Sequence, residues 1–195
     1  MSEPGQHIIL ASQSPRRCQL LDQIGIRYSQ VNADIDESVH CAEQAFEYAS
    51  RMAREKALAA VEDSATPVLG ADTVVVIDGR ILGKPESRSE AVEMLTALSG
   101  RVHHVITAVA LITTDGKCLQ SSNTTLVEFK NLSSEEIYTY CDSGEPMDKA
   151  GGYAIQGRAA KFVCRIEGSF SGVMGLPLYE TAELLRRAGV MALPG

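Results

Sequence analysis

Asp72 is the residue whose surroundings most favour chemistry, because it interrupts the otherwise apolar run from Val68 to Ile77. A carboxylate buried in a strand is costly unless it is paired, hydrogen-bonded or bound to a cation. Two structural interpretations compete: the carboxylate caps a neighbouring turn, or a bulge at Gly70 exposes it at the edge of a sheet. We favour a functional site, since carboxylates in such perturbed environments are often site residues.

Two adjacent arginines form the second candidate feature. Ser14 and Pro15 are typical of the first residues of a helix. Arg16 and Arg17 therefore fall in its first turn, at the positive end of the helix dipole, which is unfavourable unless an anion lies nearby. Backbone N–H groups, serine hydroxyls and guanidinium groups together suit a phosphate. Two solvated arginines on an exposed helix end are an equally good interpretation of the pattern alone.

Lys84 and Lys56 could supply further positive charge. Lys84 lies in Gly83-Lys84-Pro85, directly after a predicted hairpin that could place it beside Asp72. The segment is not a P-loop, because both the spacing of its glycines and the proline after its lysine depart from that motif. Lys56 lies in a predicted helix, where a lysine is far more often solvated than catalytic.

The segment from Asp148 to Gly157 is rich in glycine and contains Gln156 near its end. The glycines permit positive φ angles or the close approach of a ligand. The amide of Gln156 offers a donor and an acceptor, which match the O4 and N3–H of uracil or thymine. A structural hairpin with an exposed amide is the alternative interpretation.

The elements that must position these residues are helices and strands that alternate without strict βαβ regularity. Asp78-Gly79 is a strong hairpin signal, and Ser133 with Glu136 forms a capping box. Hairpins among helices predict an α/β fold with a mixed, partly antiparallel sheet and flanking helices. Strands are predicted at Ile8–Ala11, Tyr28–Val31, Val68–Ile77, Arg80–Leu82, Val102–Thr113, Leu119–Phe129 and Phe162–Ile166, and helices at Pro15–Ile24, Ala42–Val61, Ser87–Leu98, Ser133–Cys141 and Pro177–Ala188.

Length and composition predict a globular protein of one domain, residues 1–195, or two small lobes that share a cleft. The net charge of −7 and the 5% aromatic content argue against nucleic acid as a partner. The longest apolar stretch, Val105 to Thr113, is far shorter than the roughly 20 residues of a membrane-spanning helix. Residues 1–11 do not form a signal peptide, so we expect a cytoplasmic protein without a membrane partner.

Taken together, the motifs resemble the Maf family of nucleotide pyrophosphatases over nearly the whole chain. The resemblance implies an α/β fold related to the inosine triphosphate pyrophosphatases, with two lobes around a cleft, and often a homodimer. The matching segments are Ser12-Gln13-Ser14-Pro15-Arg16-Arg17, Gly70-Ala71-Asp72-Thr73, Gly83-Lys84-Pro85, Leu98-Ser99-Gly100, Val105-Ile106-Thr107-Ala108-Val109, Asp148-Lys149-Ala150-Gly151-Gly152-Tyr153-Ala154-Ile155-Gln156-Gly157 and Met174-Gly175-Leu176-Pro177.

The resemblance also implies the substrate: a nucleoside triphosphate that is hydrolysed between its α and β phosphates to a monophosphate and pyrophosphate. Gln156, with Arg16 and Thr73, resembles the branch of the family that acts on dTTP and UTP rather than on 7-methyl-GTP. Modified pyrimidine nucleotides are further candidate substrates. Ser14 and Arg17 complete the set of residues expected to bind the substrate.

The catalytic and metal-binding residues follow from the same resemblance. Asp72 matches the catalytic acid/base position, and Lys56 and Lys84 match phosphate-site lysines of the family. A divalent cation, Mg²⁺ or Mn²⁺, is expected, and Co²⁺ also suits an oxygen-rich site. Its expected ligands are Asp72 and a second acid, either Asp36 or its neighbour Glu37. A nucleotide-binding regulator of cell division that hydrolyses its ligand only incidentally is the alternative function.

Overall fold

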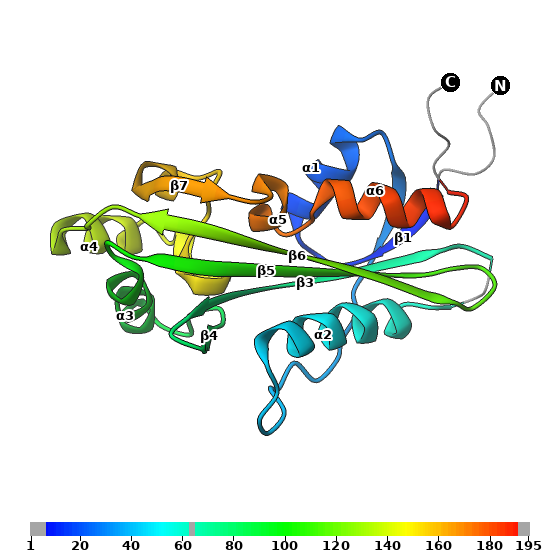
Figure 1. The fold of residues 1–195 in the computed structure, drawn as a ribbon, viewed down its shortest axis with the longest axis horizontal. Coiled ribbons are helices and arrows are strands. Elements are labelled where there is room, and N and C mark those ends of the chain that lie inside the picture. Colours follow the sequence, from blue (N-terminus) through cyan, green and yellow to red (C-terminus); the bar gives the residue numbers. More distant parts are fainter. Residues whose placement is uncertain (1–6, 63–64, 191–195) are drawn as a thin grey trace. The chain divides into compact units, whose positions relative to one another are not determined.

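A computed structural model describes residues 7–62 and 65–190, which form an α/β fold (Figure 1). Its strands are β1 (His7–Ala11), β2 (Arg27–Val31), β3 (Val68–Ile77), β4 (Arg80–Leu82), β5 (Val102–Ile112), β6 (Cys118–Phe129) and β7 (Val163–Glu167). Its α-helices are α1 (Pro15–Gln23), α2 (Ala45–Ala59), α3 (Arg88–Leu98), α4 (Ser134–Asp142), α5 (Phe170–Met174) and α6 (Leu178–Arg187). Short 3₁₀ helices span Glu145–Asp148, Ala150–Gly152 and Arg158–Phe162.

The strands form one mixed sheet of seven, in the order β2-β1-β3-β5-β6-β7, with β4 paired to β3. β1 is parallel to both β2 and β3, whereas the β3–β4 and β6–β7 pairs are antiparallel. The predicted mixed, partly antiparallel sheet with flanking helices is therefore confirmed.

The hairpin between β3 and β4 forms at the predicted Asp78-Gly79 pair. Both residues have positive φ angles, 51° at Asp78 and 74° at Gly79, as the tightest hairpin turns require. The turn sets the register that pairs Val75 with Leu82.

The described chain divides into two compact units, and each is assembled from separate stretches of sequence. The first unit comprises Met1–Asp72, Thr107–Asn123 and Gly175–Gly195, and the second comprises Thr73–Ile106 and Thr124–Met174. Three of the boundaries fall inside β3, β5 and β6, so the same strands contribute residues to both units.

In the first unit, helices lie on both sides of the strands: α2 lies on one side, and α1 and α6 lie on the other (Figure 1). The central strand β1 is correspondingly apolar, with Ile8 and Leu10 fully buried. Parallel strands covered on both faces have this composition.

The second unit has a continuous apolar core, in which aromatic side chains from β6, α4 and the segment after residue 150 pack edge to face. Phe129 meets Tyr153 with ring centroids 4.8 Å apart, and Tyr140 meets Phe162 at 5.3 Å. His103 lies in the same core, fully buried, with its Nε2 2.8 Å from the hydroxyl of Tyr153.

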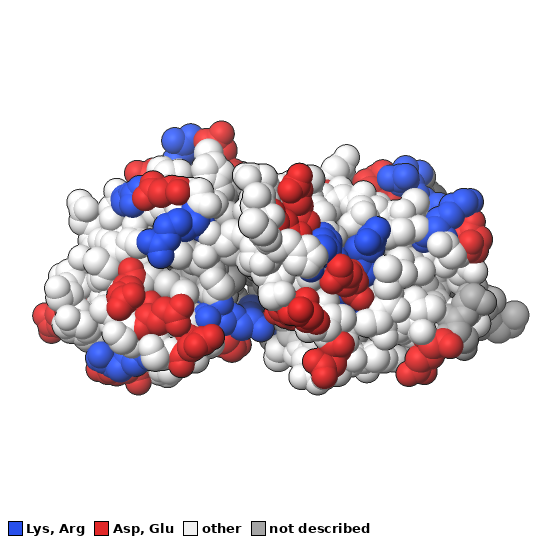
Figure 2. Space-filling model, turned by 90° about the horizontal axis from the view of Figure 1, so that it is seen from below, with Lys and Arg blue, Asp and Glu red and all other residues white. Residues whose placement is uncertain are grey.

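The surface carries charges of both signs. On the face drawn in Figure 2, Lys and Arg side chains are interspersed with Asp and Glu and form no continuous basic stripe. Across residues 7–62 and 65–190, no helix is both long and apolar enough to cross a membrane.

The glycine-rich segment from Asp148 to Gly157 contains no strand, so it does not form the hairpin of the alternative interpretation. It contains the short 3₁₀ helix Ala150–Gly152 and a turn at residues 155–157, and β7 begins at Val163, one residue after the predicted start. Gly144, Gly151 and Gly152 all have positive φ angles, which let the chain reverse repeatedly. Helix α5 was also not predicted, since its five residues are too few for a periodic pattern.

His103 should make the stability of the protein depend on pH. Burial lowers its pKa from 6.5 to about 4, so between these values the unfolded chain binds a proton that the folded chain does not. Stability should therefore fall as the pH decreases through this range, by about 1.5 kcal/mol between pH 6.5 and 5. Urea unfolding of the wild type and of His103→Gln should show this loss only in the wild type. The exposed neighbour provides the control, His104→Gln, and equal pH slopes in all three proteins would contradict the prediction.

Candidate active site

The site is built where α2 closely approaches β3, at Gly70. A Cβ atom at this position would lie 2.2 Å from the carbonyl oxygen of Ala53 and 2.7 Å from the backbone nitrogen of Ala57. Only glycine permits this approach, and fully buried alanines give α2 the small surface that it needs there. Gly70 and Asp72 are two residues apart on one strand, so both face α2.

Asp72 is paired with Lys56 of α2. The Lys56 Nζ lies 2.7 Å from Asp72 Oδ1 and 2.8 Å from Glu37 Oε1, so one ammonium group joins two carboxylates. The side chains of Asp72 and Lys56 are 11% and 12% exposed, whereas that of Glu37 is 49% exposed. The pair is thus mostly removed from water, while Glu37 remains open to it.

Burial raises the pKa of Asp72 above its ordinary value, and the Glu37 carboxylate raises it further. Lys56 and Arg17 oppose this shift through their positive charges. A carboxylate with a raised pKa is a stronger base than an exposed one, which suits proton transfer near neutral pH.

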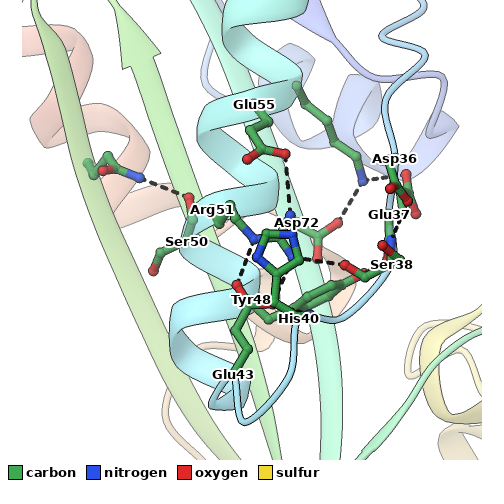
Figure 3. A network of polar contacts seen from close by, with 12 residues as sticks. Asp36, Glu37, Ser38, His40, Glu43, Tyr48, Ser50, Arg51, Glu55 and Asp72 are labelled. Carbon is green, nitrogen blue, oxygen red and sulfur yellow. Dashed lines mark hydrogen bonds and ion pairs between the residues drawn. The ribbon is translucent and has the colours of Figure 1, made fainter.

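The loop between β2 and α2 carries both acidic candidates, and α2 holds it by its backbone (Figure 3). The hydroxyl of Tyr48 donates to the carbonyl oxygen of Glu37 at 2.8 Å. Arg51, one helical turn later, donates to the carbonyl oxygen of Ser38 at 2.9 Å. These bonds involve backbone oxygens, whereas the Glu37 carboxylate pairs with Lys56.

Arg51 also closes the far end of this loop through a bidentate pair with Glu43, at 2.6 and 2.7 Å. The pairing lowers the pKa of Glu43 to about 2 and raises that of Arg51. The same carboxylate accepts the backbone N–H of His40 at 3.0 Å. The loop is therefore fixed to α2 at its middle and again just before the helix begins.

The two candidates for the second acid differ in their surroundings. Asp36 is exposed, and its Oδ1 accepts the backbone N–H of Ser38 at 2.9 Å, an interaction that lowers its pKa. Glu37, in contrast, shares Lys56 with Asp72. In residues 7–62 and 65–190 no three or more His, Cys, Asp or Glu side chains are grouped as a metal site.

Helix α1 begins as predicted, with Ser14 at the N-cap and Pro15 as its first residue. Arg17 donates to the hydroxyl of Ser12 at 3.0 Å and to the carbonyl oxygen of Gly175 at 2.8 Å. Its charge is close enough to Asp72 to influence the pKa of that carboxyl. Arg16 lies in the same first turn and is partly buried.

The remaining predicted site residues belong to the second unit. Thr73 follows Asp72 on β3 and is partly buried, Lys84 is exposed just after β4, and Gln156 is exposed in a turn. The first unit therefore contains Ser14, Arg16, Arg17, Asp36, Lys56 and Asp72, and the second contains Thr73, Lys84 and Gln156.

Three residues that shape the site were not predicted from the sequence: Tyr48, Arg51 and Ser12. Tyr48, Arg51 and Glu55 recur at helical spacing, which was a usable signal for one polar face of α2. The contact partners of that face lie in an irregular loop, which no periodicity could reveal.

The described fold has a counterpart among solved structures. It is similar to a HAM1 protein from Coxiella burnetii, with a TM-score of 0.50 over 93% of this chain and 98% of that one, at 19% sequence identity. The similarity extends over both units and supports the predicted fold class. The family model for Maf-like proteins matches residues 7–188, and the chain belongs to this family.

Relatives with about 50% sequence identity cover nearly the full chain. A protein of Methylobacillus flagellatus named dTTP/UTP pyrophosphatase is 53% identical over 191 residues, which are 96% of this chain and 95% of that protein. One of Neisseria meningitidis with the same name is 52% identical over 190 residues, 93% of this chain and 94% of its own. The membership inferred from the motifs is confirmed.

Adding a methyl group at Gly70 should separate α2 from β3. Because Gly70→Ala would meet backbone atoms, which cannot rotate away, we expect a loss of at least about 2 kcal/mol of stability, measured by urea unfolding. Gly83→Ala is the matched control, since a Cβ there meets nothing within 4 Å. A Gly70→Ala protein as stable as Gly83→Ala would refute the close approach.

Proposed function

We propose that this protein is a nucleoside triphosphate pyrophosphatase that hydrolyses dTTP and UTP to the monophosphate and pyrophosphate. The names of the relatives at about half identity support this substrate class. The observation that carries the chemistry is the buried Asp72 carboxylate, whose pKa is raised and which is held between cationic side chains. Modified pyrimidine nucleotides fall within the same proposal.

Asp72 is assigned the role of general base. Its carboxylate takes a proton from the water that attacks the α-phosphorus, and pyrophosphate leaves. Lys56 keeps this carboxylate oriented by a 2.7 Å bond, and its positive charge opposes the rise in pKa that burial causes. Because this base is buried, little solvent competes for it, and the low dielectric strengthens the electrostatic interactions within the site.

The phosphates are assigned to the cationic and hydroxyl groups. A triphosphate carries close to four negative charges, so binding and departure of pyrophosphate both need fixed positive charge. Arg16, Arg17 and Lys84 supply it together with Lys56. Ser14 and Thr73 are assigned as substrate-binding residues, and Ser14 begins α1, where backbone N–H groups suit an anion.

A divalent cation, Mg²⁺ or Mn²⁺ with Co²⁺ as a further candidate, fits this donor set. Asp72 and Glu37 both reach one cationic group, the ammonium of Lys56, so their oxygens converge. We assign Glu37 rather than Asp36 as the second acid for this reason. A cation held by one or two carboxylates and by substrate phosphates would neutralise developing negative charge when bound.

Gln156 is assigned to recognition of the base. It is exposed at a turn, and its amide can both donate to O4 and accept from N3–H of uracil or thymine. Thr73 and Arg16 accompany it in the pattern of the dTTP and UTP branch. A cytosine presents the opposite donor and acceptor arrangement at these atoms.

We also propose a cytoplasmic homodimer that binds neither nucleic acid nor membranes. The net charge of −7 supports the first of these exclusions. The alternative function is a nucleotide-binding regulator of cell division with incidental hydrolysis. Turnover separates the two: a regulator binds its triphosphate tightly and releases pyrophosphate very slowly.

Asp72→Asn should lower turnover of dTTP and UTP by at least about 10²-fold, because the amide cannot accept the proton of the attacking water. Pyrophosphate release is measured with Mg²⁺ or Mn²⁺. The control is Asp142→Asn, at an exposed carboxylate of α4, which should keep wild-type turnover. Full turnover in Asp72→Asn would remove this residue from the catalytic role, while tight binding without turnover in the wild type would favour the regulator.

Gln156→Glu should weaken dTTP and UTP relative to other triphosphates, since a carboxylate cannot donate to O4. Competition between dTTP and a second triphosphate in one reaction measures the preference directly. A loss of about 10-fold in relative kcat/KM is expected for a lost hydrogen bond to a substrate atom. An unchanged ranking of substrates would refute the assignment of Gln156.

A further inference from the structure

Gln156 projects from a tight turn whose shape is fixed by its neighbours. The backbone N–H of Gly157 donates to the carbonyl oxygen of Ala154 at 3.0 Å and closes the turn. Ile155 is buried in the core of the second unit, whereas Gln156 is exposed. The buried Ile155 therefore anchors the turn, and the amide of Gln156 points outward from it.

One tyrosine–carboxylate pair holds both ends of this turn. Before it, the N–H of Ala154 donates to the hydroxyl oxygen of Tyr140 at 3.2 Å. After it, the N–H of Arg158 donates to both carboxylate oxygens of Glu145, at 3.0 and 3.2 Å. The hydroxyl of Tyr140 in turn donates to Glu145 Oε1 at 2.9 Å and joins the two holds into one network.

The carboxylate of Glu145 also lies directly against Gly157. A Cβ at Gly157 would be 2.4 Å from Glu145 Oε1, so no side chain fits between the carboxylate and the turn. The contact reflects the same placement of the carboxylate as its hydrogen bonds to Tyr140 and Arg158. A residue that recognises a ligand by hydrogen bonds needs to be held in position in this way.

The pair is itself anchored. Tyr140 is 3% exposed and packs edge to face against Phe162, with centroids 5.3 Å apart. The N–H of Glu145 donates to the hydroxyl oxygen of Ser143 at 3.3 Å, and Lys149 donates to the Glu145 carbonyl oxygen at 3.1 Å. Because its polar partners are a hydroxyl and backbone N–H groups, the carboxylate serves to hold the chain.

We propose that Tyr140 and Glu145 determine base specificity, as positioning residues that hold both ends of the turn presenting Gln156. The proposal rests on the proposed function, in which Gln156 reads the base. An amide distinguishes uracil or thymine from cytosine only if its donor and acceptor face the correct atoms. A mobile turn would let the amide adapt to either pattern, which lowers the discrimination between uracil or thymine and cytosine.

The test compares kcat and KM of the full chain for dTTP and dCTP in Tyr140→Phe and Glu145→Gln. Each variant should lower kcat/KM for dTTP about 10-fold, mostly through KM, and change that for dCTP less than about twofold. Tyr138→Phe, two residues away on α4 at a 48% exposed side chain, is the matched control. It should leave the ratio of the two substrates unchanged.

A double-mutant cycle separates positioning from general structural support. In a Gln156→Ala background, Tyr140→Phe should not lower the dTTP/dCTP ratio further, because the group that it positions is gone. Amide hydrogen exchange at Ala154 and Arg158 should be faster in Tyr140→Phe and Glu145→Gln than in Tyr138→Phe.

The outcomes distinguish this proposal from the proposed function. Equal losses for dTTP and dCTP, an unchanged ratio, or a ratio that still falls in the Gln156→Ala background would overturn the positioning role alone. A wild type that does not discriminate dTTP from dCTP would refute base reading by Gln156, and with it the function on which the proposal rests.

Discussion

The carboxylate of Asp72, inside an otherwise apolar strand, is the constraint on which the arrangement of the first unit depends. A buried charge must be compensated locally, and Lys56 is the compensating group at 2.7 Å. That distance requires α2 to lie against β3, which in turn requires Gly70 on the strand and a surface of small residues on the helix. The buried Asp72 carboxylate thus constrains which residues are possible on both β3 and α2.

The loop between β2 and α2 places the Glu37 carboxylate near Asp72 without using that carboxylate to hold the loop in position. Asp72 and Glu37 repel one another, and one ammonium is shared between them. The loop nevertheless stays in place because Tyr48 and Arg51 bind the carbonyl oxygens of Glu37 and Ser38, and Arg51 also pairs with the Glu43 carboxylate. Fixing the backbone keeps the carboxylates available for a substrate or a cation, which is the preorganisation that electrostatic catalysis needs.

The sequence predicted those features whose signals are local. The turn at Asp78-Gly79 and the capping box at Ser133 each depend on a few adjacent residues, and both formed as predicted. The irregular segment after residue 144 and the hold of Arg51 on Ser38 did not follow from periodicity. They depend on contacts between residues distant in the chain, or on glycine conformations that composition leaves open. The motifs identified Asp72 and Lys56 as candidates, but only their distance showed that they form a pair.

The boundary inside β3 has an evolutionary consequence. Asp72 ends a segment of the first unit, and Thr73 begins a segment of the second. On the assignments made above, the general base and its lysine belong to one packed core, whereas Gln156 and the pair that seats it belong to the other. Changes at Gln156 and in the turn that holds it therefore need no repacking around the buried carboxylate. A lineage of such proteins could change how Gln156 recognises the nucleobase by substitutions within the second core while inheriting Asp72 and Lys56 unchanged.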